Sequence, residues 1–363
     1  MGIAYDYHRG RESVIKYLKQ WEEMTERIGF WLDMEHPYVT FDANYIESCW
    51  WIIRQLWDKG LIYQGYRVTP HCPRCGTSLS SHEVALGYKD DAEDPSIYVK
   101  FRLDPTEPKV DEVFGEGHVV PDGKPTYLLA WTTTPWTLPG NTALAVAPDA
   151  EYAVMESEKD YLVMASALKA VVGNEDYKLA FTVKGSDLVD LRYEPLFDPG
   201  QYGVERRRFE NSVPVLQEPV TGLTYPVIGA DFVSMEEGTG IVHIAPAFGE
   251  LDFEAGIDNS LDFVQQVDLQ GNITGSYLFS GLFVKDADPL ILHDLDSRGQ
   301  LYRSGMIRHT YPFCWRCDAP LLYYAKTTWY IKTTAVKDRL ISGNAEINWY
   351  PEYIKYGRFG DWL

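Results

Sequence analysis

The chain has 363 residues, of which 45% are hydrophobic and 14% aromatic, so it is long enough for two or three domains with a sizeable core and is not a disordered tail. Its formal net charge of −20 excludes whole-molecule attraction as the force that recruits a polyanion such as nucleic acid, so any RNA contact is expected to be local. No apolar run reaches the roughly 18 residues that span a bilayer, and MGIAYD at the N-terminus starts neither a signal peptide nor a myristoylation motif, so we expect a cytoplasmic protein with no membrane contact.

The first sixty residues predict helices. The segments VIKYLKQWEEM (14–24) and NYIESCWWIIRQLWDKG (44–60) repeat apolar residues at helical spacing, and Gly60 stands where a helix C-cap belongs. Cys49 shares the apolar face of the second helix with Trp50 and Trp57. We therefore expect Cys49 to pack in the core as a small hydrophobic residue.

Between Tyr88 and about Val284 the chain changes to short β-rich runs separated by Pro, Gly and Asp. The candidate strands are SIYVKFRL (96–103), TYLLAWTTT (126–134), TALAVAP (142–148), EYAVMES (151–157), YLVMASAL (161–168), PVIGADFV (226–233) and GTGIVHIA (238–245). A helix over PLILHDLDSRG (289–299), ended by Gly299, follows them. The pattern predicts an α+β fold with a compact, barrel-like β-rich insert between helical flanks.

Two cysteine pairs share one spacing. HCPRCGTSL (71–79) and FCWRCDAPL (313–321) both read Cys-x-Arg-Cys-x-x-x-Leu after a proline, and they contain Cys72, Cys75, Cys314 and Cys317. Four thiolates satisfy tetrahedral zinc with no open position, so we favour one shared structural zinc site that clamps the two strands entering and leaving the insert. The alternatives are two independent reduced pairs or a thioredoxin-like redox motif, although neither pair follows a βαβ pattern.

Two segments carry candidate chemistry. AWTTTPWTLPGN (130–141) places Thr132, Thr133 and Thr134 between two tryptophans, and EEGTGIVHIAPAFGELDFEAG (236–256) places Asp252 nine residues after His243. Neutral hydroxyls, an imidazole, a carboxylate and aromatic walls suit an ammonium-bearing substrate, because a carboxylate pairs with the ammonium and bulky walls limit size.

Other chemistries lack their motifs. The chain has no G-x-S-x-G elbow, no Walker sequence, no third glycine after GTG and no second histidine at metal-ligand spacing from His243. The structural alternative stays open: a lone strand-end histidine, an ordinary threonine-rich strand, and Asp252 as a helix cap.

The same residues resemble the isoleucyl-tRNA synthetase family over nearly the whole chain. WTTTPWTLPGN and GTGIVHIAPAFGELD resemble the signature segments of its editing domain. TERIGFWLDM (25–34) and YIESCWW (45–51) resemble the segment before that insertion, and NWYPEYIKYGRFGDWL (348–363) resembles the return to the catalytic core. The related valyl and leucyl enzymes carry an arginine after the threonine pair, where this chain has Thr134, Pro135 and Trp136.

The family's ATP-binding signatures, HIGH and KMSKS, are absent from these residues. The resemblance therefore implies a middle portion of the enzyme that does not activate isoleucine, with ATP and Mg²⁺ used only by the full-length protein. It implies a helical core-flanking segment at 1–66, a zinc-bearing stalk at 67–94 and 301–335, an editing domain at 95–300, and a return to an incomplete Rossmann-type core at 336–363.

By resemblance, the chain hydrolyses the valyl ester of isoleucine tRNA, since valine and isoleucine differ by one methylene worth only about 1–3 kcal/mol in a binding pocket. Asp252 is expected to bind the substrate ammonium, His243 to place the aminoacyl group, and Thr132, Thr133 and Thr134 to line the pocket. The attacking water is placed partly by the ribose hydroxyl, so no protein nucleophile is expected. The remaining expected substrate contacts are Trp131, Trp136, Gly240 and Phe248.

Leu251 departs from the family, which often has an acidic residue there. Arg206, Arg207 and Arg208 form a basic run in an expected loop that could meet acceptor-end phosphates, or could be a solvated charge cluster. The implied partners are the 3′ end of isoleucine tRNA, its valyl ester and valyl-adenylate, with the protein a monomer. Two alternatives remain: a folded fragment without hydrolysis of its own, and a zinc-stabilised module that only binds the acceptor stem.

Overall fold

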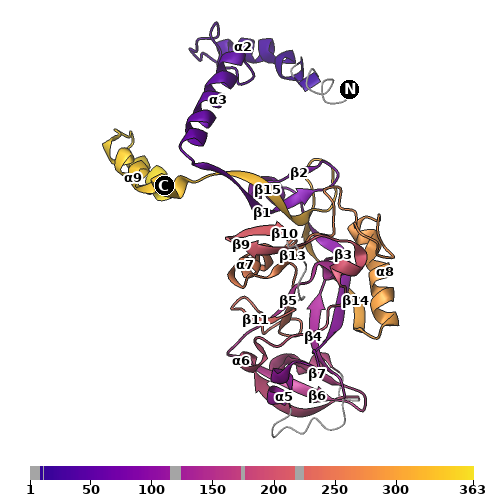
Figure 1. Ribbon diagram of the computed structural model, residues 1–363. Coiled ribbons are helices and arrows are strands. Elements are labelled where there is room, and N and C mark those ends of the chain that lie inside the picture. The colour runs from indigo at the N-terminus through magenta and orange to yellow at the C-terminus, as the bar shows by residue number, and fades with distance from the viewer. Residues whose placement is uncertain (1–8, 11, 115–123, 173–175, 217–224) are drawn as a thin grey trace. The chain divides into compact units, whose positions relative to one another are not determined.

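The computed structural model describes residues 9–10, 12–114, 124–172, 176–216 and 225–363 (Figure 1). Contacts divide the chain into two units, one made of residues 1–63 and 330–363 and the other of residues 64–329. The predicted α+β class is confirmed. Within the described ranges none of the sheets closes into a barrel, because each strand order has two different ends.

The first unit is helical. Its elements are α2 (Leu18–Arg27), α3 (Ala43–Asp58), η4 (Thr333–Val336), α9 (Lys337–Glu346), α10 (Tyr353–Gly357) and α11 (Phe359–Trp362). The predicted end of α3 is confirmed, because Gly60 takes a φ of +66° just beyond it. The expected core position of Cys49 is wrong: α3 has no buried residue, and its neighbours Trp50 and Trp57 are 66% and 55% exposed. The helix forms as its periodicity predicts, but none of its residues is buried.

The second unit is built on a six-stranded sheet. In spatial order its strands are β14 (Leu301–Pro312), β3 (Tyr88–Arg102), β4 (Thr126–Thr132), β7 (Tyr161–Ala165), β6 (Glu151–Glu156) and β8 (Lys178–Lys184). Only the β4–β7 pair is parallel. The strands predicted at 96–103, 126–134, 151–157 and 161–168 all form, while β8 and β14 extend the sheet on either side.

Three small sheets complete the strands. One has the order β11 (Val227–Gly229), β5 (Ala143–Val146), β12 (Ile241–Ile244); the second β10 (Val213–Leu216), β9 (Arg206–Glu210), β13 (Asp262–Val264); and the third β15 (Leu322–Ile331), β1 (Ile62–Cys72), β2 (Thr77–Ser78). The predicted strands at 142–148, 226–233 and 238–245 meet in the first of these. That sheet places the end of β12 beside the segment that follows β4.

Short helices join these sheets. They are α4 (Ser81–Ala85), α5 (Pro108–Phe114), η1 (Pro135–Gly140), η2 (Ser166–Val171), α6 (Gly185–Leu188), η3 (Pro199–Tyr202), α7 (Glu250–Asp258) and α8 (Val284–Ser297). Helix α8 begins earlier than its sequence pattern predicts, runs alongside β14 (Figure 1), and ends before Gly299, whose φ is +67°. No helix in the described ranges combines the length and apolar character needed to cross a bilayer.

The core of the second unit is continuous across the large sheet and the β11–β5–β12 sheet. Phe101, Leu128, Leu144 and Tyr152 are fully buried in one cluster with Trp136 and Phe248. The turn η1 is itself wholly buried. Consequently the segment with the threonine row is fixed by the core on several sides.

Candidate functional site

The threonine row begins where β4 ends. Thr132 is the last residue of β4, and its hydroxyl accepts the Thr134 backbone N–H at 3.1 Å. The hydroxyls of Thr132 and Thr134 lie 3.2 Å apart, and that of Thr134 lies 3.4 Å from the hydroxyl of Thr137. The row therefore continues into η1 through Thr137. Thr133 lies beside it and makes no side-chain hydrogen bond to the described residues.

His243 forms a hydrogen bond with the last hydroxyl of this row, that of Thr137. It lies on β12 opposite Leu144 of β5 and is 8% exposed. Its Nε2 is 2.8 Å from the hydroxyl of Thr137, and its Nδ1 is 3.1 Å from the amide nitrogen of Asn141. Burial lowers the pKa of His243 to about 4, so the imidazole is neutral near pH 7.

The hydrogen bonds around Asn141 fix which nitrogen of His243 carries the proton. The Asn141 Nδ2 donates to the Ala143 carbonyl at 2.9 Å, and the Tyr193 hydroxyl donates to its Oδ1 at 2.6 Å. Nδ2 is therefore the donor to His243 Nδ1, which must accept, and the proton sits on Nε2 and is donated to Thr137. Both ring nitrogens are thus engaged by the protein.

Asp252 is tied to the strand that carries His243. It lies in the first turn of α7, and its Oδ2 accepts the backbone N–H of Ala245 at 2.9 Å. Gly249 makes room for this, because a Cβ there would lie 2.7 Å from the Asp252 carboxyl carbon. Burial raises the pKa of Asp252 to about 6, against the lowering effect of the Ala245 bond. Near pH 7 the carboxylate is mainly ionised, which suits it to a cation.

Two aromatic rings meet beside the row. Trp136 is 3% exposed and packs edge-on against Phe248, with ring centroids 5.2 Å apart and planes at 73°. Trp131 lies elsewhere: successive residues of a strand face opposite sides, so it points away from Thr132, and its Nε1 donates to the Ser96 hydroxyl at 2.9 Å. The structure thus brings Trp136 and Phe248 together and leaves Trp131 on the other face of β4.

Gly240 has a packing explanation. Its φ is +70°, a Cβ there would lie 2.4 Å from the Cβ of Ala165, and its carbonyl accepts the Tyr152 hydroxyl at 2.7 Å. Only glycine fits such a close approach at positive φ. The residue thus joins β7 to the segment before β12, and its expected contact with the substrate stays a prediction.

The basic run at 206–208 does not form the expected loop. It begins strand β9, and Arg206 is 5% exposed and paired with the buried Asp262. Arg208 bonds the same carboxylate at 2.9 Å, and Arg207 bonds the Tyr66 hydroxyl at 2.6 Å. Alternation along β9 and the buried acid explain the difference, since an inward arginine needs a charged partner.

The four cysteines converge. The sulfur atoms of Cys72, Cys75, Cys314 and Cys317 all lie within 4.8 Å of one another. Tetrahedral zinc with bonds of about 2.3 Å holds its sulfurs about 3.8 Å apart, so the donor set fits that metal. The buried Leu79, Val84 and Leu321 pack around the cluster. These residues can therefore hold one metal ion that links the two cysteine-bearing turns.

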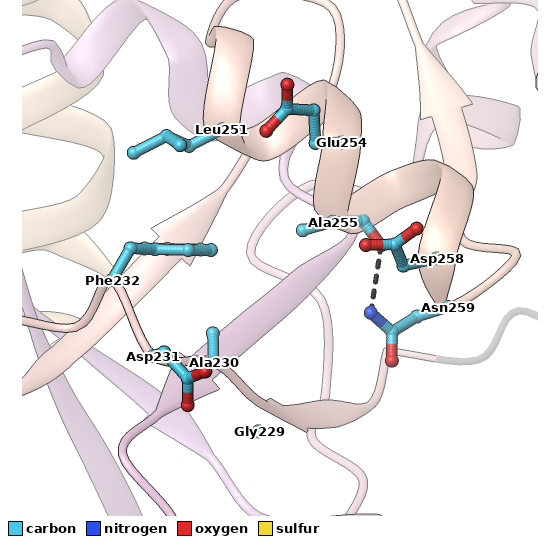
Figure 2. Close-up of a pocket in the computed structure, with 9 residues that line it drawn as sticks. All are labelled: Gly229, Ala230, Asp231, Phe232, Leu251, Glu254, Ala255, Asp258 and Asn259. Carbon is cyan, nitrogen blue, oxygen red and sulfur yellow. Dashed lines mark hydrogen bonds between the residues drawn. The ribbon is translucent and has the colours of Figure 1, made fainter.

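A separate hollow lies on the outer face of α7 (Figure 2). It has a volume of about 370 Å³ and is lined by Gly229, Ala230, Asp231, Phe232, Leu251, Glu254, Ala255, Asp258 and Asn259. The carboxylates of Asp231, Glu254 and Asp258 would repel an anionic ligand. None of the predicted site residues lines it, but Leu251, 52% exposed, projects there. The side chain at 251 thus lies away from the threonine row.

Sequence reasoning did not single out Thr137 and Asn141, although both stand inside the segment 131–141. The sequence signal for Thr137 is its spacing of three residues from Thr134. In a 3₁₀ turn, residues i and i+3 lie on the same side, so the turn aligns Thr137 with Thr134. The residues that bond the backbone of this turn from distant segments, Gln266 and Asp288, carry no such local signal.

Comparisons with known proteins agree on one family. A family model described as tRNA synthetases class I (I, L, M and V) matches residues 1–363. The isoleucine--tRNA ligase of Dehalococcoides mccartyi (strain CBDB1) is 54% identical over 362 residues, covering 100% of this chain and 35% of that protein. That of Clostridium novyi (strain NT) is 43% identical over 354 residues, covering 97% and 31%. The chain spans about a third of the length of these relatives.

A solved structure is distantly similar. The editing domain of the P. knowlesi cytosolic leucyl-tRNA synthetase is 11% identical, covers 60% of this chain and 98% of that chain, and has a TM-score of 0.41.

Proposed function

We propose that this chain, which belongs to the class I tRNA synthetase family, is the editing portion of an isoleucine--tRNA ligase. In that role it hydrolyses the ester that joins valine to isoleucine tRNA. The observation that carries the proposal is the hydroxyl row that ends on a neutral, fully engaged His243, with the Asp252 carboxylate bonded two residues further along the same strand end. The isoleucine--tRNA ligases among its relatives support the choice of amino acid.

Asp252 recognises the substrate ammonium in this proposal. One carboxylate oxygen accepts the Ala245 N–H, and the other has no bonded partner among the described residues. An arriving ammonium pairs with the free oxygen and favours the ionised form further. The location in the first turn of α7 adds a small stabilisation of the anion by the helix dipole.

Hydrolysis then needs no protein nucleophile. Water forms a bond to the ester carbonyl carbon, the bond from that carbon to the ribose oxygen breaks, and a proton from the water passes to that oxygen, which leaves as the ribose hydroxyl. The hydroxyls of Thr132 and Thr134 hold the acyl group and the water by hydrogen bonds. His243 positions Thr137 and is no general base, since both its nitrogens already have partners.

The preference for the valyl over the isoleucyl ester follows from the rigid wall that Trp136 and Phe248 form. Trp136 and Phe248 are packed edge-on and buried, so their rings cannot move apart cheaply to admit a longer side chain beside the hydroxyl row. A site of this kind accepts the valyl group and excludes the isoleucyl group by size. Synthesis alone cannot make this distinction, because one methylene is worth about 1–3 kcal/mol.

The remaining assignments are proposals of the same kind. Residues 95–300 form the editing domain, 67–94 and 301–335 its stalk, and 1–66 and 336–363 the flanking core pieces. A zinc ion on the four cysteines supplies a structural cross-link. Arg207 and Arg208, about a third exposed, remain candidates for phosphate contact. The partners are the tRNA 3′ end, its valyl ester and valyl-adenylate, for a cytoplasmic monomer whose parent enzyme uses ATP.

Deacylation tests the proposal. The chain is mixed with valyl and isoleucyl esters of isoleucine tRNA, beside an Asp252→Ala variant and a Glu254→Ala control on the outer face of α7. We expect turnover of the valyl ester alone, lost in Asp252→Ala and kept in the control. Tight tRNA binding without turnover would instead support a binding module, and neither activity would indicate a fragment that depends on the rest of the enzyme.

A further inference from the structure

The backbone N–H and the backbone carbonyl of Trp136, together the Trp136 peptide, are each held by a buried polar side chain. The Asp288 Oδ1 accepts its backbone N–H at 3.0 Å, and the Gln266 Nε2 donates to its carbonyl at 3.1 Å. Asp288 is 3% exposed and Gln266 is fully buried. The first N–H groups of a helical turn lack partners within the turn, so a side chain that satisfies one fixes how the turn begins.

The fit around this peptide leaves little space. A Cβ at Gly140 would lie 2.7 Å from the Gln266 Oε1 and 3.0 Å from a ring carbon of Phe248. The Gln266 Oε1 has no hydrogen-bond partner among the described residues, and burying it unpaired is costly. The hydrogen bond that the Gln266 side chain makes among the described residues is therefore the one from its Nε2 to the Trp136 carbonyl.

Displacement of this peptide would move the site. Trp136 carries the ring that packs on Phe248, and the next residue, Thr137, carries the hydroxyl that accepts from His243. Asp288 comes from α8 and Gln266 from the segment after β13, so two elements outside the threonine segment set its position.

Asp288 sits among other charged groups. Lys285 lies one turn earlier on α8, Asp94 of β3 pairs with both Lys285 and His309 of β14, and Tyr311 of β14 lies close by. Burial raises the pKa of Asp288 to about 7, which Lys285 and the Trp136 amide oppose and Asp94 reinforces. Its Oδ1 can accept the Trp136 N–H whether or not the carboxyl is protonated.

We propose that Asp288 and Gln266 are positioning residues that clamp the Trp136 peptide and so set the size limit of the editing site. The proposal rests on the proposed function. Without the clamp, the Trp136 ring and the Thr137 hydroxyl move apart and the larger isoleucyl group enters. The neutral amide of Asn at 288 keeps an acceptor oxygen and should preserve the limit, whereas Ala should not.

The test measures hydrolysis of valyl and isoleucyl esters by the 363-residue chain. Asp288→Ala and Gln266→Leu should raise the isoleucyl rate relative to the valyl rate about tenfold, and Asp288→Asn should stay within about twofold of wild type. Asp160→Ala is the matched control, because Asp160, just before β7, is a buried carboxylate bonded to Lys100 of β3 and to Tyr177. An unchanged ratio in the first two variants, or an equal change in Asp160→Ala, would overturn the proposal.

Amide exchange separates the clamp from the reaction. Exchange of the Trp136 N–H should be about tenfold faster in Asp288→Ala than in Asp288→Asn, because only the second variant keeps the acceptor. If the wild-type chain hydrolyses neither ester, the proposed function and the size limit both fail. Amide exchange of the Trp136 N–H then still shows whether Asp288 holds the Trp136 peptide. Equal exchange in the two variants would show that Asp288 does not hold this peptide.

Discussion

Replacing Thr137 by valine tests the link between the threonine row and His243. The Thr137 hydroxyl is buried, accepts from His243 Nε2 at 2.8 Å and donates to the Thr134 carbonyl at 2.8 Å. Valine has nearly the same shape, so the change removes these two bonds, and the weaker 3.4 Å contact with the Thr134 hydroxyl, without opening a cavity. The buried imidazole N–H is left without an acceptor, at about 1–3 kcal/mol, and the lost carbonyl bond adds about 0.5–1.5 kcal/mol. We expect a loss of about 2–4 kcal/mol in the free energy of unfolding.

The chain offers a matched control for this change. Thr142 is 1% exposed and its hydroxyl has no partner among the described residues, so Thr142→Val removes an unpaired polar group and should not destabilise. Urea unfolding followed by tryptophan fluorescence measures both variants, with an unchanged slope showing that the unfolded state is comparable. A loss below about 0.5 kcal/mol for Thr137→Val, or equal losses in both, would refute the network as described.

Three further predictions concern the charged and thiol groups. The pKa of His243 is about 4 in the folded state and 6.5 in the unfolded state, so wild type should lose about 3 kcal/mol of its free energy of unfolding as the pH falls from 6.5 to 4. His243→Gln should abolish this pH dependence, which urea unfolding midpoints measured across the same pH range would show. The folded pKa of Asp252, about 6, lies above its unfolded value, so ionisation of Asp252 lowers the free energy of unfolding as the pH rises. Asp252→Asn should therefore unfold at a higher temperature than wild type at pH 8 and at the same temperature at pH 4. Its rate of valyl ester hydrolysis should fall below that of wild type. Cys75→Ser should reduce zinc from about one ion per chain by metal analysis, and an unchanged zinc content would contradict a shared site.

Local patterns predicted the parts of the fold that local physics determines. The strands at 126–134 and 238–245 follow from their β-rich runs, and the ends of α3 and α8 follow from Gly60 and Gly299, which take positive φ. The cysteine pairs were found because a metal site repeats its spacing. The convergence of all four thiols, across about 240 residues of sequence, needed the structure.

Long-range pairing explains what sequence reasoning missed. Nothing near Arg206 in the sequence shows that Asp262 lies beside it, so the basic run reads as a loop. In the structure it lies on β9, the middle strand of its sheet, with Arg206 and Arg208 paired to Asp262. The tryptophans at 131 and 136 look equivalent in the sequence, yet the pleat of β4 sends the first away while η1 turns the second into the core. Cys49 was misplaced for the opposite reason: periodicity identifies an apolar face but not whether anything covers it.

The distribution of charge bears on how a substrate reaches the site. The net charge is −20, the hollow outside α7 is lined by three carboxylates, and the arginines of β9 are engaged by Asp262, Tyr66 and Glu205. Long-range attraction of tRNA therefore finds little support in the described part of this chain. In the proposed reaction the acyl group is covalently attached to the tRNA, so binding of the tRNA body by the rest of the proposed parent enzyme would raise the local concentration of the ester. The site itself then has to recognise only an ammonium, an ester and a side chain of limited size. In the proposed site a carboxylate, a hydroxyl row and two packed rings would supply these contacts, and a rigid wall would create the difference in affinity between the two side chains.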